Sequence, residues 1–239
     1  MRTGDVTLDT QDGPMRAYEA VPDDDARAAV IVIQEAFGVN AHIEDVTRRV
    51  ADAGYRAIAP ALFHRAGGDP TAPYDDFSKV LPLFEGLDDD KILMDVDAAI
   101  AHLHDAGFTD DKIGIVGFCM GGRVTFLTAV RRAIGAAVGF YGGGIVTARF
   151  PQFPALIDEA GNLKTPWLGL FGDADGGIPI DDVERLRATL DDVAPVEHEI
   201  VRYPGAEHGF HCDVRPSYDE AAAKDGWART LAWFGSHLG

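Results

Sequence analysis

The sequence predicts an α/β protein in which a mostly parallel central sheet is flanked by helices on both faces. One observation behind this prediction is that short, continuous apolar runs, typical of strands buried on both faces, alternate along the chain with amphipathic helical segments. A second is that the alternation continues through the chain without an internal repeat or a low-complexity linker. A length of 239 residues is common for one α/β domain, so we expect residues 1–239 to form a single domain.

The N-terminal part of the chain predicts a hairpin followed by a strand, a helix and a second strand. Segments 5–8 and 15–20 flank Asp12-Gly13-Pro14, a turn signal that favours a hairpin. Ala29–Ile33 is a short apolar run rich in β-branched residues, as in a buried strand. Residues 44–53 are predicted as a helix that ends at Gly54, and 55–59 as the next strand.

The rest of the chain repeats this alternation. Residues 88–106 are predicted as the clearest helix, because apolar side chains recur every three or four positions and Gly107 marks its end. The remaining predicted elements are strand Ile113–Phe118, helix 121–132, strands 136–141 and 167–171, helix 181–190, strand 197–203 and a helix within 218–238. Segments 63–87 and 142–164, rich in Gly, Pro and Asp, are predicted to cover the sheet edge where parallel strands end and where such folds bind ligands.

The charge balance excludes several classes of protein. The chain carries 39 acidic and 21 basic residues, a formal net charge of −18, which disfavours nucleic acid as a partner. Residues 1–13 lack the apolar core of a secretory signal, and no apolar run approaches the roughly 20 residues that span a bilayer. Two cysteines cannot build a disulfide framework. We therefore expect a soluble cytoplasmic protein, a monomer or weak homodimer, that acts on a small molecule without nucleic acid or membrane partners.

The segment Gly117-Phe118-Cys119-Met120-Gly121-Gly122 lies where a predicted strand ends and a predicted helix begins. A nucleophile on such a sharp turn needs glycine two positions before and after it, because larger side chains would collide with the strand and the helix. The helix N-terminus favours a thiolate at Cys119, since its unpaired N–H groups stabilise negative charge. A buried cysteine in a glycine-rich turn is the alternative for this motif taken alone.

The order of residues further along the chain favours the catalytic interpretation. Nucleophile-elbow hydrolases run in the order nucleophile, acid, histidine, with the acid and the histidine each following a later strand. Asp175 follows the predicted strand 167–171, and His208 follows the predicted strand 197–203. The sequence therefore predicts a triad of Cys119, Asp175 and His208, with Asp173 as the alternative acid.

With these motifs, nearly the whole chain resembles the dienelactone hydrolase family of α/β-hydrolases. The resemblance rests on the Gln-Glu-Ala-Phe-Gly-Val-Asn block at 34–40, the Cys119 turn, Asp175-Gly176-Gly177-Ile178-Pro179 and His208-Gly209-Phe210. It implies an α/β-hydrolase fold, carboxymethylenebutenolide-type hydrolysis, Cys119 as nucleophile, His208 as base and Asp175 as the group that orients the imidazole. It also implies that Glu35 is a buried glutamate that contacts the resting thiol and receives its proton when substrate displaces it.

Attack by a thiol on a lactone or ester carbonyl needs fixed donors for the oxyanion. The backbone N–H of Met120 lies just after the nucleophile, and that of Ala36 is suitably placed if its loop crosses the sheet edge. A thiolate leaves more easily than an alkoxide, so collapse of the intermediate expels sulfur again unless the substrate has a good leaving group. We therefore expect an enol lactone or an activated ester, and poor turnover of ordinary alkyl esters and amides.

Recognition of the substrate is where the chain departs from the resembling family. The best-known members bind a dienelactone carboxylate with one arginine near the position of Phe77 and another four residues after the histidine, where this chain has Cys212. Replacement arginines would be Arg65, the first candidate, Arg123 or Arg215. Together with the acidity, the missing arginines favour a neutral lactone or ester. Residues predicted to line the pocket are Phe37, Phe63 and Tyr141.

The residues leave two further possibilities to consider. His208, His211, Cys212 and Asp213 are close in sequence, but no second cluster supplies further metal ligands at a recognisable spacing, so we expect neither a metal nor an organic cofactor. Alternative functions are a non-catalytic or redox-sensing protein of the same fold, in which Cys119 responds to oxidants, and a broad esterase with an unrelated physiological substrate.

Overall fold

The computed structural model describes residues 1–239 and contains one eight-stranded sheet with the order β1-β2-β4-β3-β5-β6-β7-β8. The hairpin β1–β2 is antiparallel and pairs antiparallel with β4, whereas every later pair is parallel. The predicted mostly parallel sheet is therefore confirmed. The strands are β1 Arg2–Thr10, β2 Gly13–Val21, β3 Ala29–Ile33, β4 Arg56–Pro60, β5 Ile113–Phe118, β6 Ala136–Phe140, β7 Trp167–Gly172 and β8 His198–Tyr203.

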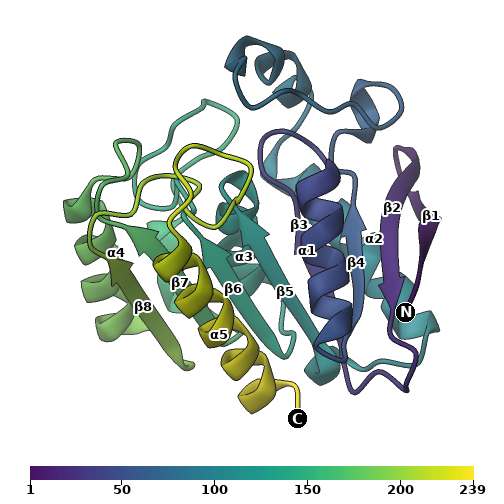
Figure 1. Cartoon of the computed structure of the whole chain (residues 1–239). Helices are drawn as coiled ribbons and strands as arrows, with labels where there is room; N and C mark the ends of the chain where they lie inside the picture. The colour runs from purple at the N-terminus through teal and green to yellow at the C-terminus, as the bar shows by residue number, and fades with distance from the viewer.

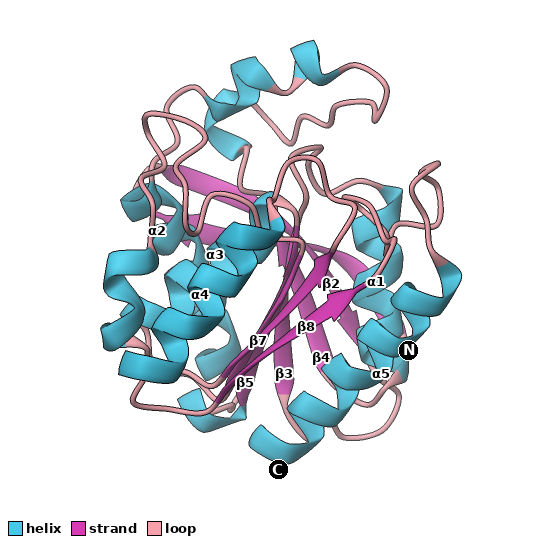
Figure 2. Cartoon of the chain, turned by 90° about the vertical axis from the view of Figure 1, so that its left-hand side faces the viewer, coloured by secondary structure: helices cyan, strands magenta, loops and turns pink.

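Five α-helices cover the two faces of the sheet. Helices α1 and α5 lie on one face, and α2, α3 and α4 lie on the other (Figures 1 and 2). Because both faces are covered, β3 and β5 are buried along their whole length, which explains their uninterrupted apolar sequences. The helices are α1 Ala41–Asp52, α2 Asp89–Asp105, α3 Met120–Arg131, α4 Ile180–Val193 and α5 Glu220–His237.

Helix α1 begins three residues before the predicted start. The side-chain Oδ1 of Asn40 accepts hydrogen bonds from the backbone N–H groups of His42 and Ile43, at 3.1 and 3.2 Å. This cap satisfies two of the N–H groups that the first turn leaves without a partner, so the helix starts at Ala41.

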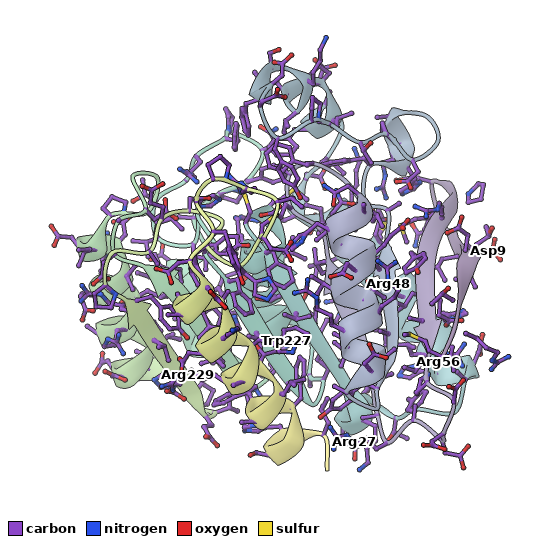
Figure 3. All side chains as sticks on the ribbon, viewed as in Figure 1. Asp9, Arg27, Arg48, Arg56, Trp227 and Arg229 are labelled. Carbon is purple, nitrogen blue, oxygen red and sulfur yellow. The ribbon has the colours of Figure 1, made fainter.

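Exposed acidic side chains lie on helices, strands and loops, and some of those on the helices are paired. Arg48 on α1 contacts Asp45 at 3.4 Å, and Arg229 on α5 contacts Asp225 at 2.6 Å (Figure 3). Such exposed pairs contribute little to stability, typically about 0.2–1 kcal/mol each. None of the helices is long and apolar enough to cross a bilayer.

The two predicted insertions lie above the carboxyl ends of the parallel strands (Figure 1). Residues 63–87 contain the short 3-10 helices His64–Ala66, Phe77–Lys79 and Leu81–Phe84, and residues 142–164 contain Ile157–Asn162. Both segments supply residues to a cavity of about 980 Å³, in agreement with their predicted position over this edge of the sheet.

Candidate active site

Cys119 lies on the turn between β5 and α3 with a backbone φ of +56°, a conformation shared among non-glycine residues only with Tyr141. Flanking glycines make this turn possible. A Cβ on Gly117 would lie 2.2 Å from the carbonyl oxygen of Gly121, and a Cβ on Gly121 would lie 2.5 Å from that of Ile33. No side chain fits at either position, so the glycines hold the strand, the turn and the helix in contact.

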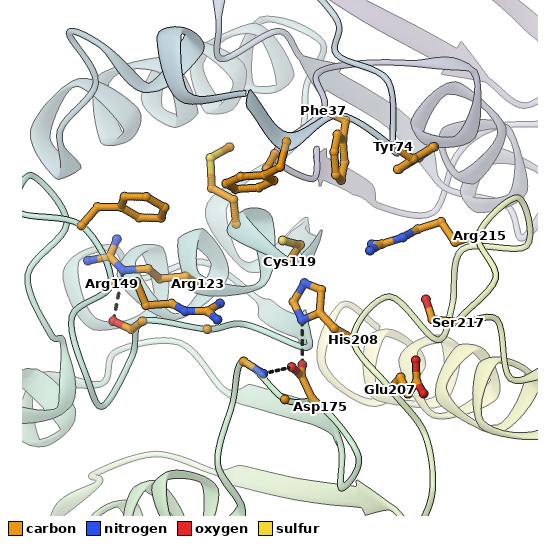
Figure 4. A pocket seen from close by; sticks show the side chains of 18 of the residues that line it. Phe37, Tyr74, Cys119, Arg123, Arg149, Asp175, Glu207, His208, Arg215 and Ser217 are labelled. Atoms are coloured by element: carbon orange, nitrogen blue, oxygen red, sulfur yellow. Dashed lines mark hydrogen bonds and ion pairs between the residues drawn. The ribbon is translucent and has the colours of Figure 1, made fainter. Parts of the chain in front are cut away.

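His208 and Asp175 come from the loops after β8 and β7. The imidazole Nδ1–H of His208 donates to Oδ2 of Asp175 at 2.6 Å, and Oδ1 of Asp175 accepts from the backbone N–H of Gly177 at 2.8 Å (Figure 4). The Asp175 carboxylate is therefore fixed by two donors. With Nδ1 committed to Asp175, the other imidazole nitrogen is left for Cys119.

The charge of this group of residues favours a protonated imidazole. Burial lowers the pKa of His208, but negative charge on Cys119, together with hydrogen bonds to Asp175 and Cys119, outweighs burial and raises the pKa to about 10. The cause is electrostatic, since an imidazolium between a thiolate and a carboxylate is stabilised on both sides.

A cavity of about 980 Å³ opens above these residues, and Cys119, Asp175 and His208 all line it. Its size reaches the upper end of the range of roughly 300–1,000 Å³ found for small-molecule sites. Phe37 lines the cavity, as predicted from its position after β3. Aromatic residues that sequence reasoning missed also form its wall, since local sequence does not show that the two insertions meet: Tyr74, Phe77, Phe84, Phe150 and Phe153.

Two residues with candidate backbone donors line the same cavity. Met120 is the first residue of α3, where N–H groups have no acceptor within the helix, and it lines the cavity beside Cys119. The backbone N–H of Ala36 makes no hydrogen bond within the protein, although this residue is almost completely buried. An N–H left without a partner at such a position is available for a developing oxyanion.

Glu35 is completely buried beside the cavity. Its Oε1 accepts a hydrogen bond from Nη1 of Arg215 at 3.3 Å, whereas its Oε2 has no hydrogen-bond partner. Arg215 lines the cavity and lies over the rings of Phe37 and Tyr74, with its guanidinium carbon 5.7 and 5.5 Å from their centroids. The contact partner of the buried glutamate is thus an arginine of the C-terminal part of the chain.

The structure corrects the prediction that Arg65 forms an anion site. Its guanidinium makes a bidentate pair with Asp95, at 2.6 and 2.9 Å, and a further bond to Asp12 at 2.7 Å, and it does not line the cavity. Arg123 lines the cavity but holds the buried Asp89 in the same bidentate way, at 2.6 and 2.9 Å. Both arginines therefore serve structural ion pairs, whose acidic partners lie far away in sequence.

Two other predicted pocket residues lie behind the cavity wall. Phe63 is buried and packs against Phe84, with ring centroids 6.0 Å apart, so Phe84 takes the place at the cavity surface. Tyr141 is also fully buried, and its ring supports the imidazole of His208 from 5.1 Å. Neither side chain lines the cavity. The sequence placed both at strand or loop ends, but it did not show that neighbouring aromatic rings would cover them.

The alternative acid and the neighbouring histidine have other partners. Asp173 accepts from Nε of Arg202 at 2.7 Å and does not line the cavity. His211 lies in an aromatic cluster, 4.9 Å from the ring centroids of both Phe118 and Phe140. Across the chain, no three His, Cys, Asp or Glu side chains are grouped so that they could hold a metal ion.

Comparison with known proteins identifies the family. The model of the "Dienelactone hydrolase family" matches residues 15–238. A protein of Methylorubrum extorquens named "Putative carboxymethylenebutenolidase" is 40% identical to this chain, over 97% of this chain and 80% of the relative. A protein of Salmonella typhimurium with the same name is 42% identical, over 99% of this chain and 88% of the relative. The crystal structure of a "Putative Dienelactone Hydrolase" from Klebsiella pneumoniae shares 40% identity, with a TM-score of 0.90 over 98% of each chain.

These matches span nearly the full chain at an identity well above the level at which only the fold is shared. They agree with the mostly parallel eight-stranded sheet described above. The chain therefore belongs to the dienelactone hydrolase family of α/β-hydrolases and is a lactone or ester hydrolase.

Proposed function

We propose that the protein hydrolyses a small lactone or activated ester, of the dienelactone or carboxymethylenebutenolide type, through a Cys119–His208–Asp175 triad and a thioester acyl-enzyme. The observation that carries the proposal is the 2.6 Å contact from His208 Nδ1 to Asp175 Oδ2 in the cavity that Cys119 also lines. The relatives' names support the same class of substrate.

The first half of the reaction is acylation of Cys119. The Cys119 thiolate attacks the carbonyl carbon, and the oxygen becomes an oxyanion that the N–H groups of Met120 and Ala36 stabilise. The intermediate then expels the substrate's enolate or phenolate, which takes a proton from the His208 imidazolium. Asp175 keeps the imidazole in the orientation that this transfer needs.

The second half is hydrolysis of the thioester. Once Cys119 is acylated, its sulfur carries no negative charge, so one of the interactions that raises the pKa of His208 is lost. The imidazole is then more readily neutral and accepts a proton from the attacking water. Collapse of the second intermediate releases the acid and restores the thiolate–imidazolium pair.

Glu35 is proposed to hold the proton that leaves the resting Cys119 thiol when substrate binds, as the family resemblance implies, and to return it to the thiolate after the product has left. Its complete burial and its partnerless Oε2 support a carboxylate that can accept a proton inside the protein. Its pairing with Arg215 places a cavity residue in contact with it.

Because both Cys119 and Cys212 are free thiols and the mechanism needs Cys119 reduced, we propose that the enzyme works in the cytoplasm.

The test combines kinetics with mass spectrometry. Hydrolysis of an enol lactone and of nitrophenyl esters is followed for the wild type, Cys119→Ala, His208→Ala and Asp175→Asn, and the masses of trapped intermediates are measured. We expect an acyl adduct on Cys119 and a loss of kcat of about 10²–10⁴-fold in each variant. Cys212→Ser is the matched thiol control and retains the adduct. Full activity of Cys119→Ala, or an adduct on another residue, would contradict the mechanism.

A further inference from the structure

Three arginines line the cavity, and only one of them has no acidic partner. Arg123 pairs with Asp89 at 2.6 Å, and Arg215 pairs with Glu35 at 3.3 Å. Arg149, from the insertion 142–164, lines the cavity but makes no hydrogen bond or ion pair within the protein. Its positive charge is therefore available to a bound molecule.

Glycines on two loops make the room that the Arg149 guanidinium occupies. A Cβ on Gly177 would lie 2.2 Å from Nη2 of Arg149, and a Cβ on Gly143 would lie 2.5 Å from its Nη1. Any larger residue at either position would displace the guanidinium. Gly177 belongs to the Asp175 loop, so this packing places the solvent-exposed Arg149 at the side of the cavity next to the triad acid.

The side chain is directed toward the reacting atoms. Figure 4 shows Arg149 extending into the pocket toward the middle, where Cys119, His208 and Asp175 lie, whereas the guanidinium of Arg123 is turned away. Arg215 approaches from the opposite side of Cys119 in the same view. The cavity thus has a cationic group on each side of the nucleophile, and the one near Asp175 is unpaired.

The acidic residues of the cavity leave Arg149 free. Asp175 is committed to His208 and to the backbone of Gly177. Asp75 and Glu207 also line the cavity, but neither forms an ion pair with Arg149. A guanidinium can bind a carboxylate through two parallel, charge-assisted N–H···O bonds, and the exposed Arg149 has no internal partner that competes for them.

We propose that Arg149 binds an anionic group of the substrate, a carboxylate in the simplest case, on the Asp175 side of Cys119. The apolar body of such a substrate would pack against Phe150 and Phe153, which line the cavity on the same insertion as Arg149. The inference rests on the proposed function and narrows its substrate class to anionic esters and lactones. It reverses the expectation of a neutral substrate, and the position lies in a different segment from the two where the resembling family carries its arginines.

The kinetic test uses two esters that differ only in charge at the far end of the acyl chain. These are the mono-p-nitrophenyl ester of glutaric acid and p-nitrophenyl pentanoate. In Arg149→Gln we expect kcat/KM for the glutarate ester to fall about tenfold or more, because a charge-assisted hydrogen bond is lost. We expect kcat/KM for the pentanoate ester to stay within about twofold of the wild-type value. Arg185→Gln, which removes an exposed arginine outside the cavity, is the control and leaves both values unchanged.

A second variant displaces the guanidinium without removing its charge. Gly143→Ala places a methyl group 2.5 Å from Nη1 of Arg149, so we expect selective loss of activity toward the glutarate ester there too. An equal loss for both esters in Arg149→Gln, or no loss for either, would overturn the proposal.

Binding to inactive enzyme separates this inference from the proposed function. The intact glutarate ester is titrated by calorimetry into Cys119→Ala and into Cys119→Ala/Arg149→Gln. We expect Kd to be at least about tenfold weaker in the double variant. If the wild type hydrolyses neither ester but this difference in Kd is found, the anion site stands and the proposed hydrolysis fails. Equal Kd values would overturn the anion site even where hydrolysis is observed.

Discussion

Nη1 of Arg215 lies 3.3 Å from Oε1 of Glu35, and this arginine is the only side chain that donates a hydrogen bond to the buried carboxylate. The Glu35 side chain is 0% exposed, whereas that of Arg215 is 18% exposed. The buried carboxylate therefore has Arg215 as its one compensating positive charge, whereas the arginine side chain also retains access to the cavity.

Removing the arginine is expected to cost more stability than neutralising the glutamate. Arg215→Met leaves an uncompensated buried carboxylate, which lowers the free energy of unfolding by about 3–5 kcal/mol. Glu35→Gln removes that charge, so Glu35→Gln/Arg215→Met is expected to recover most of the loss. Urea denaturation of the four proteins measures the coupling. Additive losses in the double variant would show that the pair does not hold the carboxylate in place.

The protonation of His208 is expected to depend on Cys119. With the sulfur present, the pKa of His208 is raised to about 10, against the effect of burial. In Cys119→Ala the negative charge and the hydrogen bond of the sulfur are absent, while burial still disfavours the imidazolium. The pKa therefore falls, and Asp175 alone opposes the fall. NMR titration of the imidazole in both proteins measures the change. A pKa that stays near 10 in the variant would mean that the sulfur does not interact with His208.

Buried His211 is expected to make the fold sensitive to acid. Burial lowers its pKa to about 3, so the folded protein holds it neutral, whereas the unfolded chain protonates it below about pH 6.5. Its contribution to stability is complete above about pH 6.5 and is lost as the pH falls from there toward 3. In that window it adds a slope of about 1.4 kcal/mol per pH unit to the free energy of unfolding.

The variant His211→Phe keeps an aromatic ring against Phe118 and Phe140 but cannot take up a proton. Denaturant unfolding at several values between about pH 6.5 and 4 gives the slope for both proteins. We expect the variant to show the smaller slope, whatever its stability at neutral pH. Parallel lines for the two proteins would contradict the assignment of the acid sensitivity to His211.

The sequence predicted those features that depend on local pattern. Strands β3 and β5 have the predicted bounds, because uninterrupted apolar runs specify burial on both faces. The positions of Cys119, Asp175 and His208 at strand ends followed from the same alternation of elements, and the structure places all three around one cavity.

Pairing between side chains far apart in the sequence could not be predicted. Arg65 was the favoured anion site, but its partner Asp95 lies 30 positions away on α2, and no local signal joins them. Arg149 was missed for the converse reason, since an arginine in a loop gives no sign that it lacks an acidic partner. The sequence features related to it are the glycines at 143 and 177, which make room for its guanidinium.

Close contacts with the backbone at the end of β3 and in the loop after it are expected to exclude any side chain at Gly121. A Cβ there would meet the carbonyl oxygens of Ile33 and Gln34 at 2.5 and 2.6 Å, and backbone atoms cannot yield as a flexible side chain can. Gly121→Ala is therefore expected to lower the free energy of unfolding by about 3 kcal/mol or more. Urea and thermal unfolding measure the loss.

Gly235 provides the matched control for Gly121, because a Gly→Ala substitution there is expected to raise the free energy of unfolding instead of lowering it. It lies exposed on α5, no other atom lies within 4 Å of the place that its Cβ would take, and its φ is not positive. Gly235→Ala is expected to stabilise the protein by about 0.5–1 kcal/mol, because alanine loses less backbone entropy in a helix. Both variants are measured by the same unfolding experiments. A Gly121→Ala protein as stable and active as Gly235→Ala would show that the Cys119 turn does not need the close backbone contact.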